Sequence, residues 1–363
     1  MDVTPLDTPW KQTLRRRMLR WFRAAARDLP WRQAKTLYHV WISEIMLQQT
    51  QVATVVPYFE RFIERFPDIA SLAAADEQEV LRFWEGLGYY RRARQLHHAA
   101  QLICERHQGD FPRDVEDVRA LPGIGRYTAG AILSIALDAR EPILEANTIR
   151  TYSRLLAFRG NPATAEGQQT LWSFAEEILP RKHVGDFNQS LMELGSEICT
   201  PRDPQCSRCP VASLCPTQAQ GLQSQIPQPK KKTCYEQVTE AAMVVRRGEK
   251  ILLRRCGVDE RWTGLWDFPR FEIVSQRGKK LQRELEEKTR DLTGLTVTAQ
   301  QRFATIKHGV TRYRITLHCH DAELVAGQVQ DSAQWIALSQ LEDLPLSVTG
   351  RKIGNLLTTA LRE

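Results

Sequence analysis

The chain has 363 residues, 42% hydrophobic and 26% charged, which excludes a wholly disordered or fibrous protein and leaves room for at least two globular domains. Its net charge of +7 favours a polyanionic partner, because lysine and arginine that neutralise phosphates release condensed counterions. The longest strongly apolar stretch, near residues 129–137, is far shorter than the ~20 residues of a membrane span, and no apolar signal core begins the chain, so we expect a cytoplasmic protein without membrane attachment.

Residues 10–159 have the apolar spacing of helices. Apolar side chains recur three and four positions apart, for example at Val52, Val55 and Phe59, and strand patterns are nearly absent. Breaks that contain proline or glycine interrupt the pattern several times. We therefore predict an all-α domain of short helices over residues 1–220.

The segment LPGIG at residues 121–125 lies between two helical patterns, the second beginning near Tyr127. Glycine lets a backbone turn tightly and approach a ligand, and the free amides at the start of the next helix attract phosphate. The pattern is typical of a helix-hairpin-helix, in which Gly123 and Gly125 bind a DNA backbone without reading its sequence. A plain helix–helix turn is the alternative, since Gly-x-Gly alone is common.

Four of the eight cysteines crowd into one short segment with the spacing C-x6-C-x2-C-x5-C. They are Cys199, Cys206, Cys209 and Cys215. Four thiolates in one compact loop can ligate a four-iron four-sulfur (4Fe-4S) cluster. A structural zinc site is the alternative, but it usually pairs two short Cys-x2–4-Cys knuckles and this segment has one. Arg202 and Arg208 lie inside the loop, where a rigid cluster would hold their charge toward a DNA backbone, unless they serve only solubility.

Residues 221–237 are rich in glutamine, proline and lysine, which indicates a polar interdomain linker. Beyond it the pattern changes, because residues 241–247 and 251–255 flank a Gly-Glu-Lys turn as in a β-hairpin. We expect further strands near residues 303–307 and 313–319, and helices near residues 279–291 and 348–361. The chain is thus predicted to be α+β, with an all-α domain followed by a smaller α/β domain over residues 238–363.

Together with the hairpin and the cysteine loop, the segment SEIMLQQTQV at residues 43–52 resembles the A/G-specific adenine DNA glycosylases of the helix-hairpin-helix iron–sulfur superfamily. The segments LPWR at 29–32, WEGLGYY at 84–90 and FNQ at 187–189 also match that family, and the similarity is strongest over residues 15–230. The resemblance implies base excision repair, and we expect a nucleoid-associated monomer. Such an enzyme flips adenine out of adenine:8-oxoguanine and adenine:guanine mispairs in double-stranded DNA and hydrolyses its glycosidic bond.

Cleavage of that bond needs an acid that makes the purine a leaving group and a negative charge that stabilises the sugar cation. By resemblance Glu44 is the acid, and its apolar neighbours should raise its pKa; an exposed helical glutamate is the alternative. Where relatives have Asp-Gly-Asn, this chain has Glu145-Ala146-Asn147. Glu145 keeps the negative charge on a side chain one methylene longer, and Asn147 would orient it or the water.

Tyr127 stands where the bifunctional glycosylase-lyases of the superfamily carry a lysine that forms a Schiff base. Tyrosine cannot form one, so the resemblance implies hydrolysis without strong strand cleavage. It also implies that Gln49 and Tyr89 enter the base stack. The residues that would line the adenine pocket are Arg27, Trp31 and Gln189. Trp31 could instead serve core packing, and Tyr89 could be a structural aromatic of a turn.

The segment GLWDFP at residues 264–269 resembles the Nudix-like C-terminal domain of these glycosylases, which recognises 8-oxoguanine opposite the adenine. A Nudix hydrolase needs an ordered set of glutamates for magnesium, and RELEE at residues 283–287 matches it only superficially, so we predict no pyrophosphatase activity. Relatives contact the oxidised guanine with Phe-Ser-His, whereas this chain has Ile306-Lys307-His308. A lysine in place of the serine predicts weaker preference for 8-oxoguanine over guanine.

Three other functions compete with this interpretation. A non-catalytic or weakly catalytic protein that binds mismatched DNA would use the same hairpin and cluster, and the glutamate at position 145 favours it. A lyase acting on oxidised pyrimidines is disfavoured by Tyr127. A zinc-binding transcription factor is disfavoured because no base-reading helix can be recognised.

Overall fold

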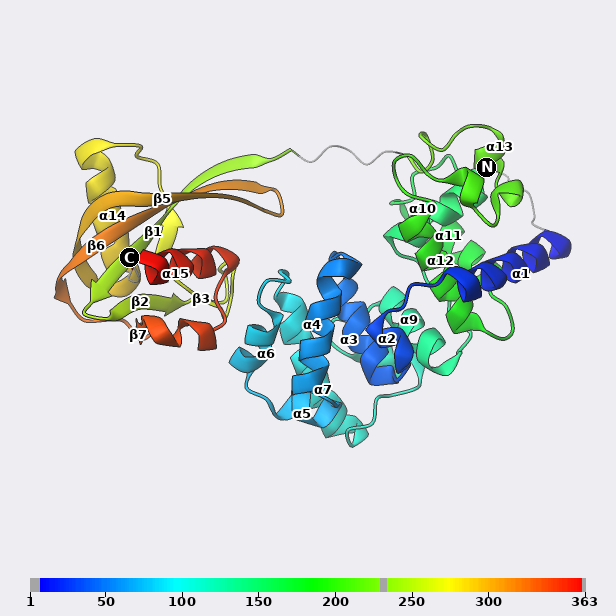
Figure 1. Ribbon diagram of the computed structural model, residues 1–363, viewed down its shortest axis with the longest axis horizontal. Helices are drawn as coiled ribbons and strands as arrows, with labels where there is room; N and C mark the ends of the chain where they lie inside the picture. The colour runs from blue at the N-terminus through cyan, green and yellow to red at the C-terminus, as the bar shows by residue number, and fades with distance from the viewer. Residues whose placement is uncertain (1–6, 229–233, 361–363) are drawn as a thin grey trace. The chain divides into compact units, whose positions relative to one another are not determined.

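The computed structural model describes residues 7–228 and 234–360. Helices alone make up the regular structure of its first part, and the first described strand begins at Glu236, which confirms the all-α prediction (Figure 1). The helices are α1 (Thr8–Ala25), α2 (Pro30–Gln33), α3 (Leu37–Leu47), α4 (Val52–Arg65), α5 (Ile69–Ala74), α6 (Glu77–Trp84), α7 (Arg91–His107), α8 (Val115–Ala120), α9 (Arg126–Leu137), α10 (Ala146–Leu155), α11 (Ala165–Ile178), α12 (Val184–Glu197), η1 (Cys206–Arg208), η2 (Ala212–Leu214) and α13 (Pro216–Ala219).

The chain forms two compact units. The first comprises residues 1–74 and 95–231, and the second comprises residues 75–94 and 232–363. The segment 75–94 therefore packs with the C-terminal part of the chain, although the helical pattern runs through it. The domain bounds expected from the sequence stay a prediction.

Part of the expected linker is well packed. Ile226 is buried, and Arg154 donates hydrogen bonds to the carbonyls of Ile226 and Gln223, each at 2.9 Å. These contacts tie the beginning of the polar stretch to α10. The expected linker residues 229–233 lie outside the described residues.

Two buried helices form the centre of the first unit. Helix α3 is apolar on almost every side, so Val40, Trp41, Ile42 and Ile45 are all buried. It packs against α9, which is buried from Thr128 to Ser134. Among the described residues, no helix combines the length and apolar character that a membrane crossing requires.

The second unit contains a mixed seven-stranded sheet, and its helices confirm the predicted α/β character. The strand order is β3-β2-β1-β6-β5, with β4 paired to β1 and β7 to β2; β1 and β6 are parallel. The strands are β1 (Glu236–Arg247), β2 (Lys250–Arg255), β3 (Trp266–Asp267), β4 (Arg270–Glu272), β5 (Leu295–Val310), β6 (Tyr313–Gly327) and β7 (Ala333–Ala337). Besides α6, the unit contains α14 (Gly278–Thr293), η3 (Leu338–Asp343) and α15 (Val348–Ala360).

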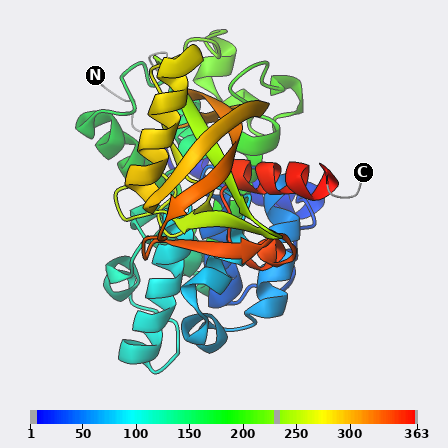
Figure 2. The ribbon, with the colours of Figure 1, turned by 90° about the vertical axis from the view of Figure 1, so that its left-hand side faces the viewer.

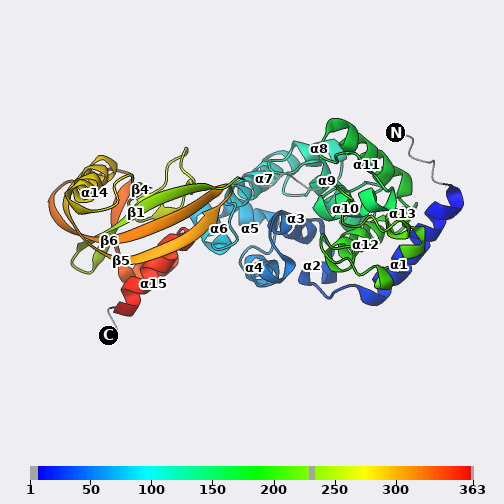
Figure 3. The same ribbon diagram turned by 90° about the horizontal axis from the view of Figure 1, so that it is seen from above.

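The predicted β1–β2 hairpin is confirmed, since Arg247 pairs with Lys250 across a turn where Gly248 has a φ of 61°. Successive residues of β1 pack alternately into two hydrophobic clusters, one on each face of the sheet. Ala242 and Val244 share one cluster with residues of α15, whereas Met243 shares the other with Leu285 of α14. The two helices consequently cover opposite faces of the sheet, as Figures 2 and 3 show.

Candidate active site

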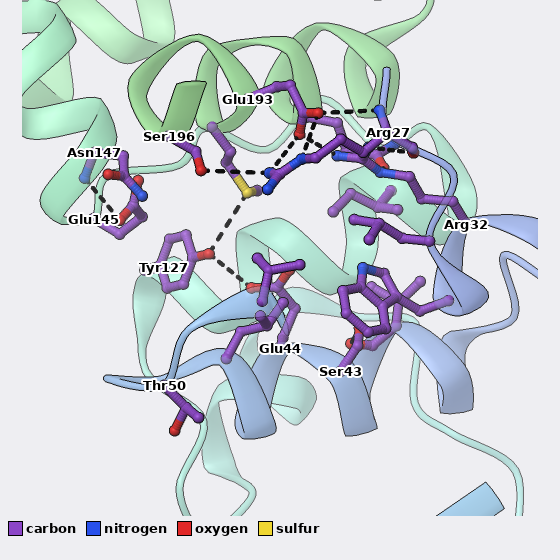
Figure 4. Close-up of a pocket in the computed structure, with 18 residues that line it drawn as sticks. Arg27, Arg32, Ser43, Glu44, Thr50, Tyr127, Glu145, Asn147, Glu193 and Ser196 are labelled. Carbon is purple, nitrogen blue, oxygen red and sulfur yellow. Dashed lines mark hydrogen bonds and ion pairs between the residues drawn. The ribbon is translucent and has the colours of Figure 1, made fainter. Parts of the chain in front are cut away.

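A cavity of about 150 Å³ opens in the first unit, where residues from α3, α9 and α12 and from the start of α10 converge (Figure 4). A cavity of that volume accommodates an aromatic ring. Its lining residues are Arg27, Leu29, Trp31, Arg32, Val40, Ser43, Glu44, Leu47, Thr50, Val52, Tyr127, Ile135, Glu145, Asn147, Gln189, Met192, Glu193 and Ser196.

Glu44 lies in this cavity with 6% of its surface exposed, so the alternative of an exposed helical glutamate is wrong. Thr36 is the N-cap of α3, the helix that carries Glu44, and its hydroxyl accepts a hydrogen bond from the amide of His39 at 3.1 Å. Burial raises the pKa of Glu44 to about 7, although a hydrogen bond from Tyr127 opposes the rise. A carboxyl group with this pKa can both give and take a proton near neutral pH.

The raised pKa of Glu44 has a consequence for stability. The folded protein retains the Glu44 proton up to about pH 7, whereas the unfolded chain releases it near pH 4.5, so folding loses stability as the pH rises between these values. Glu44→Gln removes this penalty. Above pH 7 we expect the free energy of unfolding of the variant to exceed that of the wild type by roughly 3 kcal/mol at most, given about 1.4 kcal/mol per pKa unit. The variant should therefore unfold at a higher temperature. The difference should vanish below pH 4.5; an equal difference at all pH values in thermal unfolding would contradict the assignment.

Tyr127, in the first turn of α9, donates its hydroxyl hydrogen to Glu44 Oε2 at 2.7 Å. In Figure 4 its ring lies between the Glu44 and Glu145 side chains. Burial and the two neighbouring carboxylates raise the pKa of Tyr127 well above its usual value, so the hydroxyl remains a proton-bearing donor. The contact orients one Glu44 oxygen and leaves the other for a ligand.

Glu145 is the N-cap of α10. Its carboxylate accepts hydrogen bonds from the amides of Asn147 at 2.8 Å and Thr148 at 2.9 Å, and the Thr148 hydroxyl accepts from the Glu145 amide at 2.7 Å. The extra methylene of glutamate is accommodated by this curled conformation, because Glu145 still lines the cavity. Burial raises the pKa of Glu145, while the two amides and Arg150 favour its charged form.

Asn147 is fixed from two sides. Arg150 Nη2 donates to Asn147 Oδ1 at 2.9 Å, and α12 comes so close that a Cβ atom at Gly195 would lie 2.6 Å from the Asn147 Cβ. Asn147 therefore presents a fixed polar group beside Glu145. This placement agrees with the expected orienting role, which stays a prediction.

Glu193 is a functional candidate that the sequence reasoning missed. It is 1% exposed and binds Arg27 at 2.8 Å and Arg32 at 2.9 Å. Burial alone would raise the pKa of Glu193, but the hydrogen bonds from both arginines lower it to about 2. Arg32 Nε also donates to Gln189 Oε1 at 3.1 Å. The available signal was the same as for Glu44, a glutamate flanked by apolar residues on a helix.

Of the other residues expected to contact the flipped base or the base stack, Arg27, Trp31 and Gln189 line the cavity. Gln49 and Tyr89 do not. Trp31 lines it and also packs edge-on against Phe59 with ring centroids 5.4 Å apart, so both expected roles fit. Gln49 is exposed just beyond α3 with a φ of 58°, and it is absent from the lining. Tyr89, in the second unit, is 49% exposed with a φ of 49°.

The glycines of the predicted hairpin have the expected geometry. Gly123 has a φ of 81°, which favours glycine, and Gly125 is the N-cap of α9 without a side chain over the helix amides. A Cβ atom at Gly125 would meet no heavy atom within 4 Å. The hairpin thus leaves backbone amides accessible to an anion.

The four cysteines of the loop are partly buried free thiols. Burial, and then the charges of Cys199, Cys215 and Cys206, raise the pKa of Cys209 to about 12, so the four lie close enough to interact. No three His, Cys, Asp or Glu side chains in the described ranges are close enough for a single metal ion. In a four-iron cluster each thiolate binds a different iron, so the ligands need not converge on one point.

Two arginines of α10 fasten this loop to the helix that Glu145 caps. Arg154 Nη1 donates to Cys199 Sγ at 3.2 Å, and Arg150 Nε donates to the Cys199 carbonyl at 2.6 Å. Such donors to thiolates are typical around iron–sulfur clusters. The loop therefore fits a cluster and supports the α10 end of the cavity, while Arg202 and Arg208 are exposed on its surface.

In the second unit, His308 and Lys307 lie in β5. Arg270 Nη2 lies 2.9 Å from His308 Nε2, which must accept because arginine can only donate. Burial and Arg270 lower the pKa of His308 to about 4, so the ring is neutral at physiological pH. Lys307 is exposed. Among the acidic residues at 283–287, Glu284 accepts from the amides of residues 274 and 275 at 3.0 and 2.8 Å.

Comparison with known sequences decides the family. Residues 42–177 match the model of the helix-hairpin-helix superfamily of base excision DNA repair proteins. The chain is 40% identical over 256 residues to the adenine DNA glycosylase of Buchnera aphidicola from Schizaphis graminum, covering 70% of this chain and 74% of that one. It is 30% identical over 397 residues to the adenine DNA glycosylase of Homo sapiens, covering 93% and 72%.

The chain belongs to the adenine DNA glycosylase family. It is therefore a base excision repair enzyme that hydrolyses N-glycosyl bonds in DNA. Residues 199–215 match the iron–sulfur binding domain of endonuclease III, which confirms the predicted 4Fe-4S cofactor and disfavours zinc. Residues 241–355 match the NUDIX domain and confirm the Nudix-like second domain.

Solved structures agree with this glycosylase fold. A thermostable thymine-DNA glycosylase matches with a TM-score of 0.53 at 25% identity, covering 58% of this chain and 98% of that one. A non-covalent endonuclease III–DNA complex matches with a TM-score of 0.51 at 22% identity, covering 60% and 99%. The second likeness supports the fold alone.

Proposed function

We propose that this glycosylase removes adenine from adenine:8-oxoguanine and adenine:guanine mispairs in double-stranded DNA by hydrolysis, without strong lyase activity. The observation that carries the proposal is Glu44, a buried carboxyl group with a pKa near 7 that accepts a hydrogen bond from Tyr127 and lines the same cavity as Glu145. The positive net charge favours binding to DNA, and we expect the enzyme to act as a monomer on chromosomal DNA in the cytoplasm.

In the proposed mechanism the flipped adenine enters the cavity and Glu44 donates its proton to a ring nitrogen of the base. The bond between the sugar C1′ and the base then breaks, the electron pair leaves with adenine, and positive charge develops on the sugar. The Glu145 carboxylate, held by two amides, offsets this charge. Water attacks C1′ and gives a proton to the Glu44 carboxylate, which restores the acid and leaves an abasic site.

The remaining residues would position the substrate. Arg27, Trp31 and Gln189 would hold the base, with Glu193 and Arg32 fixing two of them. Gln49 and Tyr89 would fill the gap in the base stack, and Gly123 and Gly125 would bind the backbone. Cys199, Cys206, Cys209 and Cys215 would ligate the cluster. When bound, the cluster supplies structural support rather than redox chemistry, holding Arg202 and Arg208 toward phosphate.

On the opposite strand, His308 would contact the base and Lys307 the phosphate backbone. Since His308 Nε2 is occupied by Arg270, its other ring nitrogen carries the hydrogen and can donate to a base. Lys307 would bind a phosphate group, whereas the serine of relatives can donate a hydrogen bond from its hydroxyl to the base. Preference for 8-oxoguanine over guanine would therefore be weak.

The role of Lys307 is testable by Lys307→Ser. We expect the ratio of adenine release rates opposite 8-oxoguanine and opposite guanine to rise about three- to tenfold, the size of one net hydrogen bond. Rates measured under single-turnover conditions on both duplexes give the ratio. Lys279→Ser, at an exposed position in α14, is the control and should leave it unchanged; an equal ratio in Lys307→Ser and wild type would refute the role.

The reaction type is tested by incubating the enzyme with an adenine:8-oxoguanine duplex and borohydride. We expect free adenine and an abasic strand, with no appreciable covalent protein–DNA product, because Tyr127 replaces the Schiff-base lysine. Efficient trapping would show a lyase. Release of no base from any adenine mispair, with DNA still bound, would favour the alternative of a non-catalytic mismatch-binding protein, which the unusual Glu145 leaves open.

A further inference from the structure

Tyr89 projects from a tightly held turn at residues 85–90 of the second unit. Its φ is 49°, and its side chain is 49% exposed. Beneath it, the indole nitrogen of the buried Trp84 donates to the Gly88 carbonyl at 3.2 Å, and Gly88 has a φ of 68°. The turn thus has an internal hydrogen bond and presents the Tyr89 side chain to solvent.

Glu85, at the base of this turn, is bound by Arg351 of α15. The Glu85 side chain is 9% exposed and accepts from Arg351 Nε at 2.7 Å, from Arg351 Nη2 at 2.8 Å and from the Leu346 amide at 3.1 Å. Arg351 also donates to the carbonyls of Leu341 at 2.6 Å and Leu344 at 2.8 Å. A bidentate, largely buried pair of this kind fixes geometry strongly.

The same corner of the chain, residues 346–351, also connects to His308. Ser347 Oγ donates to Asp267 Oδ2 at 2.7 Å, and Asp267 lies 3.7 Å from Arg270. Arg270 in turn contacts His308 at 2.9 Å. Residues 346–351 therefore bind Glu85 at the base of the Tyr89 turn. Through Asp267 and Arg270 they also connect to His308, the residue proposed to contact the opposite base.

A second set of bonds keeps the segment 75–94 on this domain. Gln78 accepts from Trp266 Nε1 at 3.1 Å and donates to the Gly264 carbonyl at 3.0 Å, and Arg94 donates to the Thr263 carbonyl at 2.5 Å. These partners directly precede Asp267 in the chain. Hydrogen bonds thus connect the strand that ends at Asp267 to the segment that carries the Tyr89 turn.

We propose that Glu85 and Arg351 are positioning residues that transmit recognition of the opposite base at His308 to the Tyr89 turn. The inference rests on the proposed function, because only there do His308 and Tyr89 contact DNA. A base that shifts His308 and Arg270 would shift Asp267 and the 346–351 corner, and the Glu85–Arg351 pair would carry the change to the turn. The pair would thus raise selectivity for the correct mispair rather than perform chemistry.

The test is a double-mutant cycle with Glu85→Gln, Arg351→Met and the double variant. We expect each single change to lower the ratio of single-turnover rates opposite 8-oxoguanine and opposite guanine by about fivefold. The ratio of the double variant should be no lower than that of the more strongly affected single variant. Arg255→Met is the matched control, since Arg255 pairs with Glu77 in the same segment but at 3.6 Å with both side chains over 40% exposed. An unchanged ratio, an additive double effect or an equal slowing on both duplexes would overturn the proposal.

Hydrogen exchange supplies a readout that needs no catalysis. In full-length Arg351→Met without DNA, we expect amides 86–90 to exchange about tenfold faster than in wild type, with no change in the β1–β2 hairpin. Unchanged exchange at 86–90, or a uniform increase across the second unit, would overturn the proposed link. If the wild type released no base from any mispair, the proposed function would fail, and exchange would still decide whether the turn and the corner are coupled.

Discussion

Replacing Glu44 by glutamine is expected to lower the single-turnover rate of adenine release by about 10²–10⁴-fold, the usual contribution of a general acid–base group. Glutamine keeps the volume and still accepts the Tyr127 hydrogen bond, but it neither gives a proton to the base nor takes one from water. The wild-type rate should fall as the pH rises through about 7, because the protonated fraction of Glu44 falls. The variant should lose this dependence.

Glu105→Gln is the matched control for Glu44, because Glu105 is an exposed glutamate of α7 that does not line the cavity. Its rate and pH profile should equal those of the wild type. Binding of mispaired DNA by Glu44→Gln should also remain within a few-fold. A Glu44→Gln variant that released adenine within tenfold of the wild type would remove Glu44 as the acid.

Removing the charge of Glu145 is expected to slow adenine release by about 10²–10³-fold, the size typical for loss of one preorganised electrostatic group. Glu145→Gln is the informative change, because its amide oxygen can still accept a hydrogen bond from one of the two amides at the start of α10. Glu145→Ala would additionally lose the helix cap, worth about 1 kcal/mol, and would mix stability with catalysis.

Glu145→Asp separates charge from length. Aspartate is a preferred N-cap and restores the residue of the relatives, so we expect activity within about tenfold of the wild type, or above it. Single-turnover adenine release from the adenine:8-oxoguanine duplex compares the three proteins. Equal rates for Glu145→Gln and the wild type would show that the negative charge at this position is not used.

The sequence predicts those parts of the candidate site whose residues belong to one local motif. Glu44 follows from a short motif that resembles the family, and the iron–sulfur loop from the spacing of four cysteines together with the same resemblance. The conformation of Glu145 was not predictable, because glutamate is not among the preferred N-caps and the Thr148 contact that completes the box appears only once the helix start is known. Glu193 was missed because its arginine partners are 161 and 166 residues away.

The packing of the segment 75–94 with the C-terminal part of the chain could not be read from the sequence, for a similar reason. Glu77, Gln78 and Glu85 on a short amphipathic helix and turn look like a solvated face. Their partners, Trp266 and Arg351, lie 188 and 266 residues away, and no local pattern encodes those contacts. Long-range polar pairing therefore decided which unit this segment joins.

The central claim is that two carboxyl groups meet around one flipped adenine nucleotide. A crystal structure with DNA that carries an uncleavable adenosine analogue opposite 8-oxoguanine tests it most directly. We expect a Glu44 oxygen within about 2.6–3.2 Å of a ring nitrogen of the base and the Glu145 carboxylate facing the sugar. A base seated elsewhere, or either carboxylate turned away from the glycosidic bond, would contradict the account.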